Sequence, residues 1–331
     1  MTSTNRIDIS PLIERQHQIV TRAQLLAARY DDMAIYRRTR SARWQRVLPG
    51  VYAVTTGALT EEQRRIAAAL YVGPAAQMTN LAALGWYGFR YAPTSDRVHM
   101  LVPGDARRKS SGHVVVSRAS ELDSFPRDAG LYRVCSPARA VVDAGRELRE
   151  MRPIRAITAE AIQRGFTDLV ALNEEVRRAK RSRTALIRRA VDEVSAGVRS
   201  APEAELRECM SGSALYPLLR WNPMLRLVDG SVLPTPDGWI AASAIAIEVD
   251  SQEFHYSPDG WRRTIDRHND LSRYGVLVLH FTPAEIRAKP ARVRQVIEDA
   301  HNARHLARVA CEVLTTDRSY AKSVNNGPLL P

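Results

Sequence analysis

Two carboxylates, Glu248 and Asp250, stand two residues apart in the run 244–250, which is otherwise apolar. Residues i and i+2 of a β-strand share a face, so both side chains are expected to point the same way. An apolar run of this kind predicts a covered central strand, where an unpaired carboxylate is strongly unfavourable. A hard divalent cation, Mg²⁺ or Mn²⁺, takes carboxylate oxygens as ligands and would compensate the charges. The pair therefore predicts a metal site, and a metal-bound water is a nucleophile for phosphodiester bonds.

A third carboxylate for this site is expected from the preceding β-prone segment. Asp237 starts that segment, and a bent strand or hairpin would bring it beside Glu248, although Asp229 fits the same requirement. The sequence thus predicts Asp237, Glu248 and Asp250 as metal ligands. The alternative is that these acids lie at the solvated end of the strand with an arginine partner.

Three histidines lie close to the acids in sequence. His255 follows the strand and suits a phosphate contact or a proton transfer near neutral pH, or a structural bond to a backbone carbonyl. His268 lies in an expected helix and His280 interrupts an apolar strand, so packing or capping is the expected role of both.

The elements that must position these residues alternate between strand and helix, which is typical of an α/β domain. From residue 199 to 304 the expected elements are a helix, two β-prone segments, a helix, a strand and a helix, at 202–210, 225–228, 238–250, 258–274, 276–281 and 283–303. Residues 305–331 are assigned to a tail, and the part after Asp317 has no periodicity and is expected to be frayed.

The segment 236–283, PDGWIAASAIAIEVDSQEFHYSPDGWRRTIDRHNDLSRYGVLVLHFTP, carries an acid, an apolar strand with Glu-x-Asp, a histidine, an arginine-bearing helix and a second apolar strand. That order resembles a bacterial domain family related to the very-short-patch-repair endonucleases of the PD-(D/E)XK superfamily. Ser200 to Glu203 resembles the upstream Ser-x-x-Glu of these proteins, so the resemblance covers about 199–304. It implies a restriction-endonuclease-like fold, a phosphate contact at Arg267, and the catalytic residues Glu203, Asp237, Glu248, Asp250 and His255.

Two positions depart from the nuclease pattern. Asp250 occupies the place where the wider superfamily has its motif lysine, and Ser251 stands where close relatives often have glycine. Both changes bear on how a water would be activated. The alternative to an active endonuclease is therefore a body that keeps the nuclease-like fold only for binding or dimerisation.

Residues 10–58 predict a winged helix. Thr21 and either Asp31 or Asp32 can cap two short helices in close succession, and two β-prone runs around the Pro-Gly pair at 49–50 predict a hairpin. A cluster of arginines lies where a recognition helix and a wing would meet DNA: Arg37, Arg38, Arg40, Arg43 and Arg46. A solvated basic helix on a packing module is the alternative interpretation.

The N-terminal half carries three further motifs, IVTRAQL at 19–25, WQRVLPGVY at 44–52 and SPARAVVD at 136–143. These motifs resemble the AbiEi-type abortive-infection antitoxins, and the resemblance covers most of residues 12–145. It implies a promoter-binding repressor that needs no catalysis, with a cognate toxin or a second copy of the chain as partner.

Residues 59–148 mix helical stretches with β-prone runs at 97–102 and 113–117, and the basic turn Arg107-Arg108-Lys109 precedes the second run. This mixture predicts an α+β region. Residues 149–198 are poor in Gly and Pro and rich in arginine, which predicts a basic helical connector. The whole chain is thus expected to be an α+β multidomain protein.

The composition favours nucleic acid as a partner. The 331 residues include 48 Lys and Arg against 36 Asp and Glu, which gives a net charge of +12 and a pI near 10.0 and a field that attracts polyanions. Cys135, Cys209 and Cys311 form no Cys-x-x-Cys pair, so buried thiols are expected rather than a disulfide framework or a zinc site. The sequence lacks a signal peptide and any apolar run of about 18 residues, so a cytoplasmic protein without membrane contact is expected.

The sequence therefore predicts a DNA-binding protein with a Mg²⁺- or Mn²⁺-dependent endonuclease-like domain. The alternative is a non-catalytic transcriptional regulator of the antitoxin type. An enzyme acting on small molecules is disfavoured, because the sequence holds neither a Gly-rich phosphate loop nor a nucleophile elbow.

Overall fold

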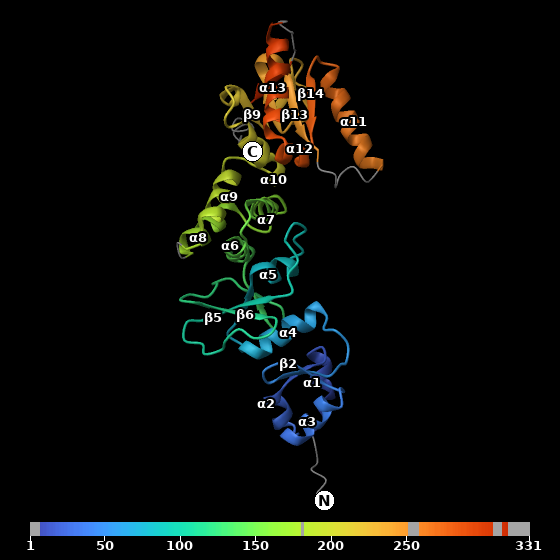
Figure 1. Ribbon diagram of the computed structural model, residues 1–331, viewed down its shortest axis with the longest axis vertical. Coiled ribbons are helices and arrows are strands. Elements are labelled where there is room, and N and C mark those ends of the chain that lie inside the picture. The colour runs from blue at the N-terminus through green and yellow to red at the C-terminus, as the bar shows by residue number, and fades with distance from the viewer. Residues whose placement is uncertain (1–6, 180–181, 251–257, 307–312, 317–331) are drawn as a thin grey trace, which may run out of the picture. The chain divides into compact units, whose positions relative to one another are not determined.

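The computed structural model of the protein describes residues 7–179, 182–250, 258–306 and 313–316. The chain divides into two compact units, Met1–Val191 and Asp192–Pro331. Each unit combines helices with two sheets, so the described chain is a mixed α+β protein, as the sequence predicts (Figure 1). Within the described ranges, no helix is long and apolar enough to cross a membrane.

The first residues of unit one form three short helices and a three-stranded sheet, in the order α1 (Ser10–Arg15), β1 (Ile19–Thr21), α2 (Arg22–Ala27), α3 (Asp32–Arg40), β2 (Gln45–Leu48) and β3 (Val51–Ala53). Thr21 caps α2 in a reciprocal capping box with Gln24, and the Asp31 side chain caps α3. Three helices followed by a β2–β3 hairpin, the wing, make a winged helix.

The sheet of this winged helix pairs in the order β1-β3-β2 and is covered on both faces. Gly50 turns the hairpin with a φ of +75°, a left-handed conformation that favours glycine. One face packs on the short helices, with Val20 and Ile35 buried between them. The opposite face joins the core of the rest of the unit, to which Leu48 and Val51 belong.

The rest of unit one is built on a five-stranded sheet of order β6-β5-β4-β8-β7. Its strands are β4 (Gln77–Thr79), β5 (Val98–Pro103), β6 (Val114–Ala119), β7 (Arg127–Asp128) and β8 (Arg133–Val134). The helices that pack against it are α4 (Glu61–Val72), α5 (Asn80–Trp86) and α6 (Pro137–Glu147). Helix α4 contacts β5 and also all three strands of the winged helix, so the two parts share one hydrophobic core (Figure 1).

Three further helices, α7 (Met151–Gln163), α8 (Leu169–Arg178) and α9 (Ala185–Ser195), occupy most of the predicted basic connector. They do not form an exposed linker. Ile157, Leu172 and Ile187 are fully buried, and they belong to the same core as the five-stranded sheet. Most of the described arginines of this stretch lie on the outer surfaces of these packed helices, whereas Arg155 of α7 is buried.

Unit two contains the elements α10 (Ala201–Met210), β9 (Leu219–Trp221), β10 (Met224–Leu227), β11 (Val232–Leu233), β12 (Gly238–Ile240), β13 (Ile245–Val249), α11 (Pro258–Ser272), β14 (Leu277–Phe281), α12 (Pro283–Ala288), α13 (Pro290–Leu306) and β15 (Val313–Thr316). Its larger sheet has the order β14-β13-β12-β9. The β13–β14 pair is parallel and the other two pairs are antiparallel. The parallel pair requires a crossover, which α11 supplies.

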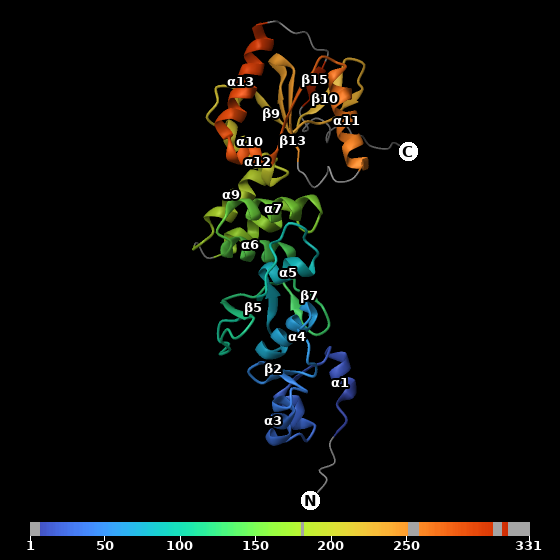
Figure 2. The same cartoon turned by 45° about the vertical axis from the view of Figure 1, so that its right-hand side comes forward.

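Strand β13 lies inside this sheet and is covered on both faces, as its apolar run predicts. Ile245 and Ile247 belong to a cluster with α10, α12 and α13. Ala246 belongs to the cluster on the opposite face, with Leu271 of α11 and Leu225 of the smaller sheet (Figure 2). The sheet therefore forms the middle layer of the unit, and its acids must lie beyond the end of this apolar stretch.

The smaller sheet, of order β11-β10-β15, contains a strand that the sequence does not predict. Residues 305–331 are expected to form a tail, but Val313–Thr316 pairs antiparallel with all four residues of β10. The prediction was wrong at these four residues because so short a strand is stabilised by its partner strand rather than by a pattern of its own.

Candidate functional site

The outward face of α3 carries large exposed side chains and positively charged ones. Ile35 is buried beneath the helix, whereas Met33 and Tyr36 are 59% and 53% exposed. Arg37 and Arg40 are exposed as well, and Nη1 of Arg40 donates to the Tyr36 hydroxyl at 2.9 Å. The spacing of these four exposed residues, i, i+3, i+4 and i+7, places them on one stripe of the helix. This stripe is the α3 face that a DNA groove would meet.

Two further arginines of the predicted cluster extend the charge to the wing. Arg43 follows α3 and Arg46 lies on β2, and both are exposed. Among the described residues, neither these two nor the two arginines of the α3 stripe form an ion pair with an acid. Asp32 at the start of α3 is bound by Arg22, with 2.6 Å between Nη2 and Oδ2. The acid on this helix is thus neutralised, while the arginines remain available to an anion.

Arg38 differs from the other arginines of the cluster. Its guanidinium lies 5.0 Å from the ring centroid of Tyr30 and 5.3 Å from that of Trp44. Nη1 also donates to the carbonyl of Ala34 at 3.3 Å. Cation–π contacts on two rings hold this side chain against the winged-helix core. Its described contacts are therefore those of a residue that fixes α3 to the body of the domain.

In unit two, Glu203 is enclosed by its own neighbours. The side chain is on α10 and is almost fully buried, with the residue only 1% exposed. Its carboxylate accepts hydrogen bonds from the Arg199 backbone N–H at 2.9 Å, from Nη2 of Arg207 at 2.9 Å and from Nδ2 of Asn222. Burial raises its pKa, and Arg207 opposes that rise. These contacts make Glu203 an anchor of the α10 N-terminus.

Asp237 and Glu248 come together where β12 begins and β13 ends. Gly238 pairs with Ile247, so the residues that flank this pair lie side by side. Asp237 accepts a hydrogen bond from the Val249 backbone N–H at 2.8 Å. Burial raises the pKa of Asp237 to about 6. Burial and the nearby Asp237 raise the pKa of Glu248 to about 7. The strand geometry thus places two carboxylates in a site where ionisation of both is unfavourable.

The other candidate for the third carboxylate, Asp229, lies elsewhere. It occupies the turn between β10 and β11, is fully exposed, and accepts a hydrogen bond from the Ser231 backbone N–H at 2.8 Å. Its contact is local, and it is Asp237 whose charge acts on Glu248. Of the two acids, Asp237 is therefore the one that lies beside Glu248.

Arg267 of α11, for which a phosphate contact was predicted, forms an ion pair with Glu248. Its Nη2 lies 3.0 Å and 3.3 Å from the two carboxylate oxygens, and it also donates to the Thr235 carbonyl at 3.1 Å. The ion pair opposes the rise of the Glu248 pKa. This is the arginine partner that the sequence left open as the alternative to a metal ion.

Asp250 is the first member of a chain of three polar side chains. Nδ1 of His280 lies 2.6 Å from Oδ2 of Asp250, and Nε2 of His280 lies 3.0 Å from Nδ1 of His268. The hydrogen bond to Asp250 raises the pKa of His280. Sequence reasoning missed this chain, although the parallel β13–β14 register, which pairs Glu248 with His280, places that histidine at the acidic end of the sheet. His255 lies outside the described residues.

The acids of unit two lie close enough together for the charges of Glu203 and Asp250 to raise the pKa of Asp237, but each acid has its own bonding partner. Within the described ranges, no group of three or more His, Cys, Asp or Glu side chains is arranged to hold a metal ion. Asp237 is bonded to a backbone N–H, Glu248 to Arg267 and Asp250 to His280. The donor set of the described residues therefore does not fit a Mg²⁺ or Mn²⁺ site with three carboxylate ligands.

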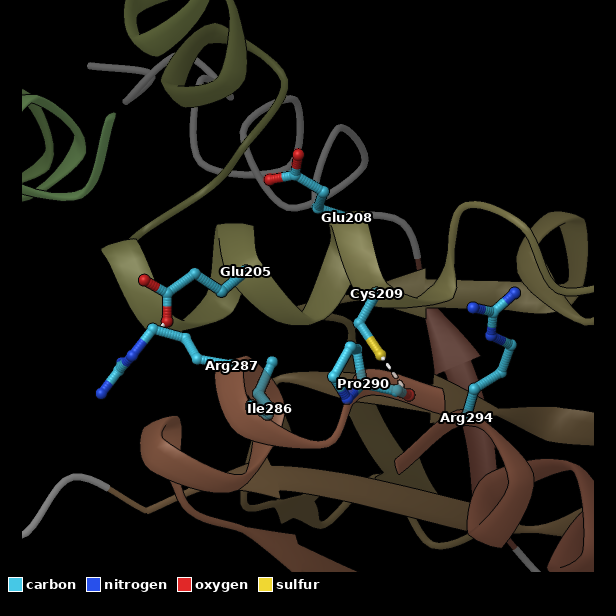
Figure 3. Close-up of a pocket in the computed structure, with 7 residues that line it drawn as sticks. All are labelled: Glu205, Glu208, Cys209, Ile286, Arg287, Pro290 and Arg294. Carbon is cyan, nitrogen blue, oxygen red and sulfur yellow. Dashed lines mark hydrogen bonds and ion pairs between the residues drawn. The ribbon is translucent and has the colours of Figure 1, made fainter. Parts of the chain in front are cut away.

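A cavity of about 280 Å³ lies between α10 and the α12–α13 pair (Figure 3). Sγ of Cys209 lies there, 3.2 Å from the Pro290 carbonyl, and Arg287 pairs with Glu205 at 3.1 Å. Burial raises the pKa of the Cys209 thiol, which disfavours the reactive thiolate. The residues that line the cavity include none of the predicted site residues.

Comparison with known proteins supports the family resemblance that the sequence predicts for the N-terminal part of the chain. Residues 8–55 match the family described as "Transcriptional regulator, AbiEi antitoxin", which confirms the resemblance over the winged helix. No curated protein matches the chain. Among solved structures, the RV2827C protein from Mycobacterium tuberculosis is similar at 15% identity and a TM-score of 0.42, over 62% of this chain and 84% of that one. The nuclease resemblance of unit two stays a prediction.

Proposed function

We propose that the protein is a transcriptional regulator that binds duplex DNA through its N-terminal winged helix. One observation carries the proposal. The exposed stripe of α3 combines Tyr36 with Arg37 and Arg40, arginines that no described acid neutralises, and it lies within the segment 8–55 that matches a family of regulators.

The chemistry of this stripe suits the major groove. A guanidinium donates two parallel hydrogen bonds to guanine or to a phosphate, so Arg37 and Arg40 can read bases or fix the register of the helix. Met33 offers an apolar surface to a thymine methyl group. Arg43 and Arg46 lie at the exit of α3 and on the wing, where contacts go to the phosphates beside the groove.

Selection of duplexes from a random library, followed by affinity measurement on the enriched sequence, tests this proposal. In the α3 triple variant, Arg37, Arg40 and Arg43 are each replaced by Gln. In the control triple variant, Gln replaces Arg90, Arg149 and Arg177, three exposed arginines of the same unit. We expect one enriched sequence for the wild type, and a large fall in affinity for it in the α3 variant alone. Equal affinities of the two variants would contradict the assignment.

The choice of a toxin as partner rests on the family match alone. The described family is an antitoxin family, so a cognate toxin is the natural partner class, with a second copy of the chain as the alternative. Both partners, and the cytoplasmic location, stay predictions. Co-expression with a candidate toxin and sedimentation of the purified chain distinguish the two partners.

A metal-dependent endonuclease activity of unit two is the second candidate function. Its support is the sheet order β14-β13-β12-β9 with one parallel pair, and the position of Asp237 and Glu248 at one end of that sheet. The described donors do not form a three-carboxylate site, so no hydrolytic step is assigned to them. An ion would have to compete with Arg267 for Glu248.

Supercoiled plasmid tests this second candidate. Nicking in the presence of millimolar Mn²⁺ is compared for the wild type and for Asp237→Asn, which keeps the shape of the side chain and removes its charge. Nicking by the wild type alone would support the nuclease. Intact plasmid with both proteins would remove the second candidate and leave the regulator.

A further inference from the structure

The connection between β5 and β6, residues 104–113, presents a second group of cations. Arg107, Arg108 and Lys109 are consecutive and all exposed. Within the part of the chain that the structure describes, none of them forms an ion pair, and Asp105 is the one acid in this stretch of sequence. We call residues 106–110 the basic turn.

The basic turn is held in one conformation by side chains from two other elements. Arg118 of β6 donates to the Ala106 carbonyl at 2.8 Å and to the Arg108 carbonyl at 2.9 Å. The Tyr71 hydroxyl of α4 donates to the Lys109 carbonyl at 2.9 Å. The Arg108 guanidinium lies 5.1 Å from the Tyr71 ring centroid. A ligand that binds these cations therefore meets a backbone that is already ordered, which lowers the entropy lost on binding.

The turn lies directly against the wing of the winged helix. Gly112 approaches β2 so closely that a Cβ added there would lie 3.2 Å from Cδ2 of Leu48 and 3.7 Å from the Val47 carbonyl oxygen. Gly112 has a φ of +53°, so a side chain would also be strained. The exposed Arg46 is on the same strand of the wing. The chain that follows the basic turn therefore contacts β2, the strand that carries Arg46.

The turn and α3 lie on opposite faces of the winged-helix sheet. Leu48, which Gly112 contacts, belongs to the core that includes α4 and the five-stranded sheet. Ile35 of α3 belongs to the separate cluster on the other face. The chain beside the basic turn therefore contacts the wing on the side that faces away from α3.

We infer that Arg107, Arg108 and Lys109 form a second contact with duplex DNA, to the phosphates that flank the wing on the side away from α3. This inference rests on the proposed function, because it assumes that α3 docks in a groove. Duplex DNA is favoured over an acidic protein partner, because the chain beside the turn contacts β2, the strand that carries the exposed Arg46, and a duplex is a polyanion long enough to reach both. Phosphate contacts carry no base preference, so the turn adds affinity and salt dependence rather than specificity.

The length of the duplex separates this contact from the one made by α3. In the turn triple variant, Gln replaces Arg107, Arg108 and Lys109, and the control triple variant described above removes the same charge elsewhere. The enriched sequence is prepared as a duplex of about 12 base pairs and within one of about 30, and the affinity of each is measured over a salt series. Melting temperatures of all variants confirm that they are folded.

On the long duplex we expect the turn variant to lose about two to three from the magnitude of the slope of log affinity against log salt, because each phosphate contact contributes about 0.9. On the short duplex it should behave as the control variant does. A turn variant that matches the control on both lengths overturns the inference while the α3 variant still tests the proposed function. An equal loss on both lengths also overturns it, since the phosphates would then lie within the site of α3. Failure of the wild type to bind either duplex overturns both.

Discussion

The half-buried carboxylates Glu248 and Asp250 of unit two each bond to a different partner, and both partners come from distant positions of the chain. Glu248 and Asp250 were predicted to share a face of one strand, and they bond to Arg267 and His280, which come from α11 and β14. The two-residue period of a strand made the first prediction possible. The partners were beyond prediction, because they are 19 and 30 residues away and no local pattern reports such contacts.

Glu248 should make the stability of the protein depend on pH. Its pKa in the folded protein, about 7, lies above its ordinary value of 4.5, so the folded state binds this proton more tightly than the unfolded state. That stabilisation is fully present below pH 4.5 and is lost as the pH rises through 7. For Glu248→Gln we therefore expect a free energy of unfolding about 1 to 3 kcal/mol above the wild type at pH 8, and no gain at pH 4.

Denaturant unfolding of both proteins across this pH range measures the effect. Asp229→Asn serves as the control, because that carboxylate is fully exposed and outside the site. Parallel stability profiles for the wild type and Glu248→Gln would show that the carboxylate is not destabilised by its surroundings, and the described geometry of the pair would be wrong.

Glu203 provides a second test at the residue scale, because the nuclease resemblance and the structure give it different roles. Replacement by Ala removes the acceptor of Arg207 and Asn222 and leaves Arg207 unpaired in a site where its side chain is 13% exposed. Breaking a buried ion pair in this way destabilises proteins by about 3 to 5 kcal/mol. We expect a loss of this size in Glu203→Ala without any added metal. A variant that melts with the wild type would exclude the anchoring role.

Among the elements, those with local signals were predicted and those that depend on pairing were not. The Thr21 and Asp31 caps predict the starts of α2 and α3, and the Pro-Gly turn predicts the wing. Strand β15 has no such signal, because its register with β10 is set by residues almost ninety positions away. The helices of the predicted connector were recognised as helices, but their buried faces against the sheet of unit one were not.

The pairing of β15 with β10 predicts which C-terminal boundary a stable fragment of unit two needs. A fragment of residues 192–331 should unfold in one cooperative transition, since it contains two clusters of its own and both sheets. A fragment that ends at residue 304 lacks β15 and exposes the edge of β10, so it should be less stable and more prone to aggregate. Equal melting temperatures for the two fragments would show that β15 adds nothing to the fold.

At the scale of the whole molecule, the position of the positive charge matters as well as its total. The net charge of +12 predicted a polyanionic partner from composition alone. We propose that this partner lies along the α3 stripe, Arg43 and Arg46, because these cations have no described acidic partners, whereas Arg267 is paired with Glu248. The sequence grouped Arg267 and Arg38 with the DNA contacts because it shows residue types and not their neighbours.

The salt dependence of duplex binding tests the central assignment most directly. Affinity for the enriched duplex is measured between about 50 and 200 mM salt for the wild type, the α3 triple variant and the control triple variant. We expect the slope of log affinity against log salt to fall in magnitude by about two to three in the α3 variant, and to stay near the wild-type value in the control. A wild-type slope retained in the α3 variant would show that the duplex does not lie on α3, and would contradict the assignment of this protein as a winged-helix regulator.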